Sequence, residues 1–389
     1  MLIVFVSNFL NHHQLPLCQA FINTDGIEFY FVATERIPQS RLDMKYEDMN
    51  CCYPFVVRAY EENETFVKAK KLAIDADVVI IGSAPNEFIE ERLKKYDKMT
   101  FRFCERSLRK GTWRRFIPKT RNRINREYIQ YNKNRLFILG ASSYTSSDIA
   151  LCGFPPEKCF RWGYFPNVIK YKETESIFQN KTCNSIIWVG RFIKCKHPEA
   201  ALNIARKLVK NGIHFKLQMV GDGPLKCKLK RDIERHGLRD YIELTGSVTP
   251  DEVRERMLNA EVFLFTSDFY EGWGAVVNEA MNSMCVPVIS HACGSAAFLI
   301  AQEENGFVYK YGNEKEASQQ ISRIFEDRRL REDLSKRAYC TMESMWNAET
   351  AVERFLVLTQ KLSEGRKASY EIGPCSVAPV IRNNWYKGV

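Results

Sequence analysis

Short runs rich in Val, Ile and Phe alternate along the chain with longer amphipathic segments. Parallel strands that are buried on both faces and joined by crossover helices produce this pattern. The sequence therefore predicts an α/β fold built on parallel sheets. The runs expected to form strands are Leu2–Val6, Phe29–Ala33, Val78–Ile81, Arg135–Gly140, Ser185–Val189, Lys216–Val220, Tyr241–Thr245, Val262–Thr266 and Val286–Ser290.

The expected strands fall into two groups, and 389 residues are enough for two domains of ordinary size. We expect a first Rossmann-like domain over residues 1–166, a polar linker over 167–184 and a second Rossmann-like domain over 185–345. Residues 346–389 are expected to form a last helix and a tail that pack back towards the first domain.

The apolar runs are far shorter than the roughly 20 residues needed to cross a bilayer. The chain begins MLIVFVSNF, without a basic leader, which predicts a buried strand rather than a secretion signal. Most of the 13 cysteines are scattered singly and no CxxC pair occurs, so free thiols in a reducing compartment are expected rather than disulfides or structural zinc. We therefore expect a cytoplasmic protein.

Positive charge is concentrated in one window of the chain. Residues 92–135 contain 16 Lys or Arg against three acids, whereas the whole chain carries a net charge of +10. Trp113, Phe116 and Tyr128 are interleaved with these cations, which suits an anionic membrane surface, including the inner face of the cell membrane, or a pyrophosphate-bearing acceptor. A solvated helix face remains an alternative. Nucleic acid is not expected as a partner, because no reader motif accompanies the basic window.

The segment Tyr270–Pro287, YEGWGAVVNEAMNSMCVP, carries the most chemical information. A strand leads into a loop with Gly272 and Gly274, after which a helix begins. Glycines let the backbone approach a ligand closely, and the free amides and dipole of a helix start favour an anion. Glu271 in the loop and Glu279 about one turn into the helix can accept hydrogen bonds from sugar and ribose hydroxyls. A lone glutamate here would usually be a solvated helix residue, but the glycine loop favours a binding site.

A second cluster follows an earlier strand, in Val189–Pro198 (VGRFIKCKHP). Ligands of open parallel sheets bind at the carboxyl ends of strands, and Arg191 and Lys196 lie there. Two fixed positive charges can stabilise a departing diphosphate without a metal ion, and Lys194 can share this task. Alone, this spacing fits a surface role equally well, but its position ahead of the Glu271 loop makes it specific.

Two further turns follow strands. VGDGP at 220–224 lacks the GxGxxG spacing of a dinucleotide site and predicts a tight turn that shapes the pocket. In LTGSVTPDEV at 244–253, Gly246–Val248 can offer backbone hydrogen bonds to the edge of a base, while Thr249 opens a helix.

In this order, VGR with Lys196, VGDGP, TGSVTPDEV and EGWGAVVNEAM resemble the retaining glycosyltransferases of family 4, whose two-domain fold is called B. The resemblance covers Ile186–Phe307. It implies two Rossmann-like domains that face a central cleft, with the nucleotide-sugar donor held by the second domain and the acceptor on the side of the first.

The resemblance also implies a role for each residue. Arg191 and Lys196 hold the donor diphosphate, Glu279 holds the ribose hydroxyls, and Glu271 with the loop amides holds the donor sugar. The implied catalytic residues are Arg191, Lys196 and Glu271. The implied donor-binding residues are Gly190, Gly246, Val248, Gly272, Trp273, Gly274, Ala275 and Glu279. No metal or cofactor is expected. Asp75-Ala-Asp77 imitates a metal-binding DxD motif, but it leads into a buried strand and is expected to be structural.

The N-terminal half resembles the family less closely. SNFLNHHQLP at 7–16 replaces the usual glycine-rich first loop and is similar to a branch of the family in bacterial surface-polysaccharide synthesis. Asn11, His12 and His13 are expected at the mouth of the first strand, on the acceptor side. A lone histidine is usually structural, but two beside Asn11 favour a functional role. The histidine that the family places after the fourth strand is replaced by FCERSLRKG, with Glu105 as its substitute.

The sequence thus predicts a metal-independent, retaining glycosyltransferase of polysaccharide biosynthesis. It would move a sugar from a nucleotide-sugar donor to a glycan or polyprenyl-diphosphate-linked acceptor. Two alternatives remain. A nucleotide-sugar epimerase or hydrolase on the same fold would turn over donor without an acceptor. A non-catalytic nucleotide-sugar-binding module would not need His12, His13 and Glu105.

Overall fold

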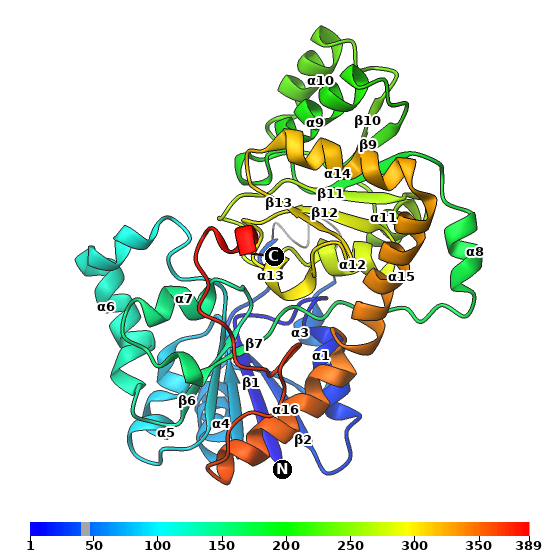
Figure 1. The fold of residues 1–389 in the computed structure, drawn as a ribbon. Coiled ribbons are helices and arrows are strands. Elements are labelled where there is room, and N and C mark those ends of the chain that lie inside the picture. The colour runs from blue at the N-terminus through cyan, green and yellow to red at the C-terminus, as the bar shows by residue number, and fades with distance from the viewer. Residues whose placement is uncertain (40–46, 389) are drawn as a thin grey trace. The chain divides into compact units, whose positions relative to one another are not determined.

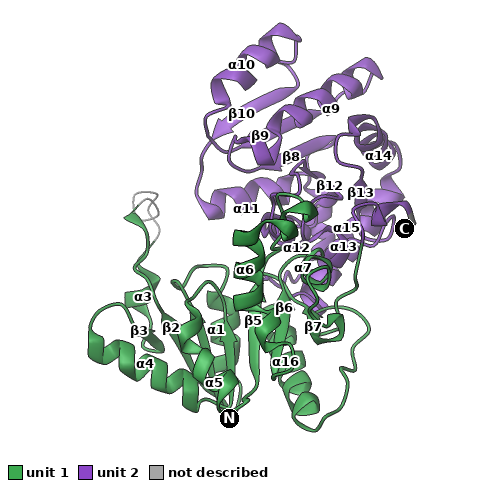
Figure 2. Cartoon of the chain, turned by 90° about the vertical axis from the view of Figure 1, so that its left-hand side faces the viewer, with its two compact units in different colours: residues 1–167, 347–381 green, residues 168–346, 382–389 purple. Residues whose placement is uncertain are grey.

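The computed structural model describes residues 1–39 and 47–388, which divide into two compact units (Figure 2). Unit 1 comprises residues 1–167 and 347–381, and unit 2 comprises residues 168–346 and 382–389. Both units are parallel α/β sheets of the Rossmann-like type, as the sequence predicts (Figure 1). Each predicted strand is present, with its ends shifted by at most one residue.

The sheet of unit 1 has the strand order β3-β2-β1-β4-β5-β6-β7, and the paired strands are parallel. Its strands are β1 (Leu2–Ser7), β2 (Glu28–Ala33), β3 (Val56–Arg58), β4 (Val78–Ile81), β5 (Thr100–Cys104), β6 (Leu136–Gly140) and β7 (Cys159–Arg161). The order reverses between β1 and β4, so side chains that follow these two strands meet at a switch point, where open parallel sheets bind ligands.

Helices on the sheet of unit 1 include the last long helix of the chain (Figure 1). The helices are α1 (Leu15–Ile22), α3 (Met49–Cys52), α4 (Asn63–Asp75), α5 (Glu90–Lys94), α6 (Pro118–Glu127), α7 (Thr145–Ala150) and α16 (Ala348–Ser363). Helix α16 packs beside α1: the ring of Phe355 lies 5.6 Å from that of Phe21 and 4.8 Å from that of Phe101. The chain then returns along β7, where the Ala378 N–H donates to Cys159 O at 2.8 Å.

The sheet of unit 2 has the order β10-β9-β8-β11-β12-β13, again parallel. Its strands are β8 (Ser185–Val189), β9 (Lys216–Val220), β10 (Ile242–Gly246), β11 (Val262–Phe265), β12 (Val286–Ser290) and β13 (Phe307–Tyr309). Its helices are α8 (Thr174–Gln179), α9 (Pro198–Lys210), α10 (Lys226–Arg235), α11 (Pro250–Asn259), α12 (Val276–Asn282), α13 (Ala296–Leu299), α14 (Glu314–Glu326) and α15 (Arg328–Ser344). The switch point of this sheet lies between β8 and β11.

Local sequence signals explain where these helices begin. Helix α9 has Pro198 in its first turn, and α11 begins with a capping box in which Thr249 and Glu252 exchange hydrogen bonds. The predicted helix start at Thr249 is therefore confirmed. Both helices follow strands at the carboxyl edge of the sheet, so their caps fix the loops that carry the candidate site.

The segment predicted as a linker has structure of its own. Residues 168–184 belong to unit 2 and contain α8, whose Phe178 is buried against Met284 and Tyr339. Lys181 is also buried, and its Nζ donates to four main-chain carbonyl oxygens. The end of the predicted tail also lies in unit 2, where the ring of Tyr386 lies 4.3 Å from that of His291. Over the described residues, no helix is both long and apolar enough to span a bilayer.

Candidate functional site

Two of the predicted site residues of unit 2 lie on either side of its switch point. Lys196 ends a short 3-10 helix (Lys194–Lys196) that follows β8, and Glu271 lies in the loop after β11. The Lys196 side chain is 17% exposed and that of Glu271 14% exposed. The fold joins them directly in an ion pair, although 75 positions separate them in the sequence.

Neighbouring side chains hold this ion pair in place. The Ser267 hydroxyl donates to Glu271 Oε2 at 3.0 Å, and Lys196 Nζ lies 5.0 Å from the centre of the Phe265 ring, within cation–π range. The Thr266 hydroxyl donates to Lys196 O at 2.7 Å. The loops after β8 and β11 are therefore joined by an ion pair and a hydrogen bond, and the residues of the ion pair, Lys196 and Glu271, are ones predicted from the sequence.

His197 forms a second link between the same loops. It adopts a left-handed backbone conformation, with φ of 48°, at the start of α9. Its Nδ1 lies 2.9 Å from Glu199 Oε1, and its Nε2 lies 3.0 Å from Asp268 Oδ2 and 2.9 Å from the Tyr311 hydroxyl. Hydrogen bonds to Asp268 and Glu199 raise the pKa of His197 to about 9. His197 is therefore a second cation, next to Lys196 in the chain, at neutral pH.

The glycine loop has the backbone geometry that the sequence predicts. Gly274 has φ of +85°, and a Cβ atom added there would lie 3.0 Å from Phe265 Cε1 and 3.2 Å from Cys293 Sγ. The position therefore requires glycine. The amides of Gly274 and Ala275 precede α12 and lie outside the i to i−4 hydrogen-bond pattern of that helix, so they remain able to bind an anion.

The Trp273 side chain is placed differently from that of a donor-contacting residue. It is 1% exposed, its Nε1 donates to Asn278 Oδ1 at 2.9 Å, and its ring lies 5.6 Å from that of Trp346. Trp273 therefore anchors the loop in the core of unit 2, and the motif alone does not separate this role from ligand binding. The partly buried Glu279 lies in α12, where burial raises its pKa to about 6.

Three glycines bring the loops after β8, β9 and β10 together. A Cβ atom on Gly221 would lie 2.0 Å from Gly190 O, and the Gly221 N–H donates to Gly246 O at 2.8 Å. Gly246 has φ of +82° and open space where a Cβ would stand. The VGDGP turn is thus a close backbone contact that aligns Gly190 with Gly246.

Arg191 and Val248 lie in these loops, but neither is held by an ion pair like that of Lys196 with Glu271 in the described structure. The Arg191 side chain is exposed, and it forms no ion pair within the described part of the chain. Val248 is partly exposed just before α11.

Asp77, from the DxD-like motif, accepts a hydrogen bond from the Leu2 N–H at 2.8 Å. Among residues 1–39 and 47–388 there is no group of three or more His, Cys, Asp or Glu that could hold a metal ion.

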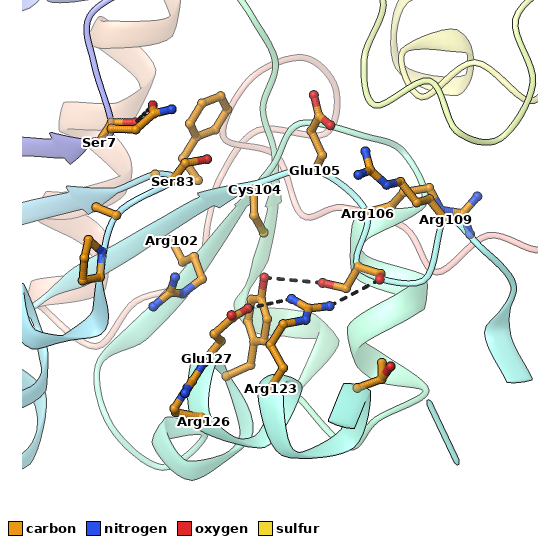
Figure 3. Close-up of a pocket in the computed structure, with 18 of the residues that line it drawn as sticks. Ser7, Ser83, Arg102, Cys104, Glu105, Arg106, Arg109, Arg123, Arg126 and Glu127 are labelled. Carbon is orange, nitrogen blue, oxygen red and sulfur yellow. Dashed lines mark hydrogen bonds and ion pairs between the residues drawn. The ribbon is translucent and has the colours of Figure 1, made fainter. Parts of the chain in front are cut away.

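A separate cavity of about 1490 Å³ lies within unit 1 (Figure 3). It is lined at the carboxyl ends of β1, β4 and β5 by Ser7, Gly82 and Cys104, which places it at the switch point of that sheet. Eight cations and three acids line it. The cations are Arg102, Arg106, Arg109, Lys110, Arg114, Lys119, Arg123 and Arg126, and the acids are Glu35, Glu105 and Glu127.

The structure brings part of the predicted acceptor-side set to this cavity. Asn11 and Glu105 line it, and Glu105 Oε1 accepts a hydrogen bond from the Tyr164 hydroxyl at 3.2 Å. The ring of His13 lies 3.8 Å from that of His12 and 6.1 Å from that of Tyr164. His13 thus lies beside a tyrosine that lines the cavity, while Asn11 also accepts a hydrogen bond from the His13 N–H and so shapes the turn before α1.

Several residues of both sites were not identified from the sequence. In unit 2 these are His197, Asp268 and Tyr311, which meet only through the fold. In unit 1, Arg102 had a detectable signal, because it places a charge within the otherwise uncharged strand segment TFRFC. A cation at such a position is unusual enough to mark a site.

Most of unit 2, including the candidate site, matches a known family model. Residues 170–341 match the family model of glycosyl transferases group 1. This segment includes the Lys196–Glu271 pair, His197 and the glycine loop.

Curated relatives are similar over part of their length. The alpha-D-kanosaminyltransferase of Streptomyces kanamyceticus is 28% identical over 153 residues, which are 39% of this chain and 39% of the relative. The lipopolysaccharide core biosynthesis glycosyltransferase LpsD of Rhizobium meliloti is 27% identical over 187 residues, 44% of this chain and 48% of the relative. The chain thus spans less than half the length of these relatives.

Likeness to a solved structure extends over both units. Anabaena HepE, solved in complex with UDP, has a TM-score of 0.64 at 14% sequence identity, covering 94% of this chain and 99% of that one. At 14% identity this similarity shows the fold alone. It confirms the predicted fold class, which is two Rossmann-like domains of the glycosyltransferase B fold.

Proposed function

We propose that this chain is a retaining glycosyltransferase of family 4 that binds a nucleotide-sugar donor in unit 2. The observation that carries the proposal is the Lys196–Glu271 pair at the β8/β11 switch point, beside the loop of Gly274. This arrangement offers a cation for a diphosphate, a carboxylate for sugar hydroxyls and loop amides for an anion. It lies inside the segment that matches the glycosyl transferases group 1 model.

Each part of the donor has a binding group in this account. Lys196 and Arg191 neutralise the diphosphate, Glu271 and the amides of Gly274 and Ala275 bind the sugar, and Glu279 binds the ribose. Burial raises the pKa of Glu279 to about 6, which still leaves it mostly ionised at neutral pH and able to accept hydrogen bonds from hydroxyls. The loop around Gly246 borders the base.

In the proposed reaction the bond between the sugar anomeric carbon and the diphosphate oxygen breaks, and the leaving diphosphate keeps the electron pair. The sugar passes through an oxocarbenium-like state. An acceptor hydroxyl attacks on the face that the diphosphate leaves, so the anomeric configuration is retained, and its proton passes to the leaving diphosphate. Lys196 and Arg191 stabilise the charge that develops on the leaving group, a task that needs no metal ion.

We place the reaction in polysaccharide biosynthesis, with a glycan or polyprenyl-diphosphate-linked acceptor on the side of unit 1. The name of the Rhizobium relative, a lipopolysaccharide core biosynthesis glycosyltransferase, supports this assignment. A membrane-bound acceptor also fits the segment Thr112–Phe116, in which Trp113 (59% exposed) and Phe116 (72% exposed) stand on either side of two arginines. Aromatic side chains interleaved with cations suit the surface of an anionic membrane.

The test is sugar transfer by the full chain from a panel of nucleotide sugars, beginning with UDP sugars, with and without EDTA. Lys196→Met is expected to lower kcat on the order of 100-fold or more, because a fixed charge at the leaving group acts in the transition state. Lys210→Met, an exposed lysine at the end of α9, is the matched control and should transfer at the wild-type rate. Wild-type transfer by Lys196→Met would remove the assignment, and loss of transfer with EDTA would remove the metal-independent mechanism.

A further inference from the structure

The cavity of unit 1 has a strong excess of positive charge that the proposed donor site does not use. Eight cations face three carboxylates around about 1490 Å³. Two of these cations are already neutralised. Arg106 makes two hydrogen bonds to the buried Asp148. Figure 3 shows the other pair, in which Arg123 lies 2.8 Å from Glu127. Within the described residues, the remaining six cations form no ion pair with a carboxylate.

Arg102 is the most informative of these six cations. It is 5% exposed, yet within the described residues its guanidinium makes one hydrogen bond, from Nη2 to Asn86 Oδ1 at 2.6 Å. Its Nε is buried and has no hydrogen-bond partner in the described structure. A guanidinium has five N–H donors, and burying them without acceptors costs free energy.

Two other buried arginines of unit 1 have several acceptors or a paired carboxylate. Arg92, at 0% exposed, donates to five main-chain carbonyl oxygens and to the Thr100 hydroxyl. Arg106, at 6% exposed, has its bidentate carboxylate. Arg92 does not line the cavity and Arg106 is paired with Asp148, whereas Arg102 lines the cavity without a carboxylate partner and keeps unused donors. The missing partner is therefore expected to be an anion that enters the cavity.

The surroundings of Arg102 hold it ready for such a ligand. Asn86, which accepts its hydrogen bond, also donates to Arg126 O at 3.0 Å, so one amide links Arg102 to helix α6. The guanidinium lies 5.5 Å from the centre of the Tyr128 ring. Arg126 also lines the cavity, so arginines from two neighbouring elements line it without a paired carboxylate.

We propose that Arg102 and Arg126 form an anion subsite in unit 1 that binds the phosphate or diphosphate group of the acceptor. The anion site stands on the geometry of unit 1, whereas the acceptor role of its ligand rests on the proposed function. Two guanidinium groups favour a phosphate oxyanion over a single carboxylate, because each can bind two oxygens of a multiply charged group. The volume exceeds the roughly 300–1,000 Å³ of ordinary small-ligand pockets, which leaves room for a sugar attached to the phosphate.

The experiment is calorimetric titration of the full chain with inorganic pyrophosphate, geranyl diphosphate and a hexose 1-phosphate. Titrations use wild type and Lys196→Met, so that binding in unit 2 is separated from binding in unit 1. Arg102→Gln and Arg126→Gln are each expected to weaken pyrophosphate binding about tenfold or more, the usual effect of losing a charge-assisted hydrogen bond. Arg121→Gln is the matched control, because Arg121 is an exposed arginine of α6 that does not line the cavity.

Arg102→Lys keeps the charge of the buried group and guards against a folding defect. It should retain the wild-type near-ultraviolet circular dichroism and bind pyrophosphate with an affinity between those of wild type and Arg102→Gln. Arg126 is exposed, so Arg126→Gln tests the subsite without disturbing the core. Equal binding by wild type and both Gln variants, or an equal loss in Arg121→Gln, would overturn the proposal.

The choice of ligand distinguishes the source of the phosphate. Tighter binding of geranyl diphosphate than of pyrophosphate supports a lipid-linked diphosphate, and tighter binding of the hexose 1-phosphate supports a phosphorylated glycan. If none of the three ligands binds, the subsite does not exist. A parallel titration with UDP isolates the proposed function: Arg102→Gln should bind UDP as tightly as wild type does, whereas Lys196→Met should bind UDP more weakly.

Discussion

Replacing His197 with asparagine is predicted to destabilise the protein in a pH-dependent manner. His197 is held between Glu199 and Asp268, and these hydrogen bonds raise its pKa from 6.5 to about 9. The stability that this raised pKa supplies is fully present below the unfolded-state value of 6.5 and is lost as pH rises through about 9. Asparagine tolerates the left-handed backbone at this position, so the substitution removes the charge with little backbone strain.

The magnitude follows from the shift. A rise from 6.5 to about 9 corresponds to about 3 kcal/mol at full effect. The His197 side chain is 22% exposed, so solvent screening reduces this to about 1–2 kcal/mol. His197→Asn should therefore lose about 1–2 kcal/mol relative to wild type at pH 6 and much less at pH 9.5.

The assay is urea unfolding of wild type and His197→Asn at pH 6 and pH 9.5, compared with His214→Asn. His214 is exposed, and its variant controls for the general loss of an imidazole. A destabilisation of the same size at both pH values would refute the charged clamp. So would a His197→Asn protein as stable as wild type at pH 6.

Two further perturbations test the donor loop and the membrane surface. Gly274→Ala should destabilise the protein by about 1–3 kcal/mol in urea unfolding and lower kcat, because its Cβ would crowd Phe265 and Cys293 at positive φ; Gly212→Ala, also at positive φ but with open space, should lose less, and equal losses would contradict the crowding. Replacing Trp113 and Phe116 together with Ser should reduce co-sedimentation with phosphatidylglycerol vesicles severalfold without changing nucleotide binding; unchanged co-sedimentation would remove these side chains from the membrane contact.

Several of the strands found from sequence are unbroken apolar runs, although β9 (KLQMV) and β10 (IELTG) also carry polar residues. β1, β4 and β8 are such runs, because a parallel strand covered on both faces has no polar side to hide. The strands not expected, β3, β5, β7 and β13, are short or carry a charge. β5 is the clearest case, since Arg102 interrupts it for a reason that only the cavity reveals.

Some residues of the unit 2 site could likewise be predicted from the sequence, and others could not. Motif order selected Lys196 and Glu271, and the fold pairs them, because loops that follow neighbouring parallel strands meet at one edge of a sheet. His197 was passed over because its partners, Asp268 and Tyr311, lie far along the chain and converge only in three dimensions. Trp273 was predicted to bind the donor because it lies within the motif EGWGAVVNEAM, whereas its side chain packs in the core of unit 2.

Lys196 and Arg191 are proposed to bind the diphosphate of the donor, and a comparison of UDP with UMP affinity tests that contact. In calorimetry with EDTA present, wild type should bind UDP more tightly than UMP. Lys196→Met and Arg191→Gln should each shrink that preference, because they remove contacts to the second phosphate while leaving contacts to the base and ribose. If both variants keep the wild-type ratio of UDP to UMP affinity, the two cations do not bind the diphosphate and the account is wrong.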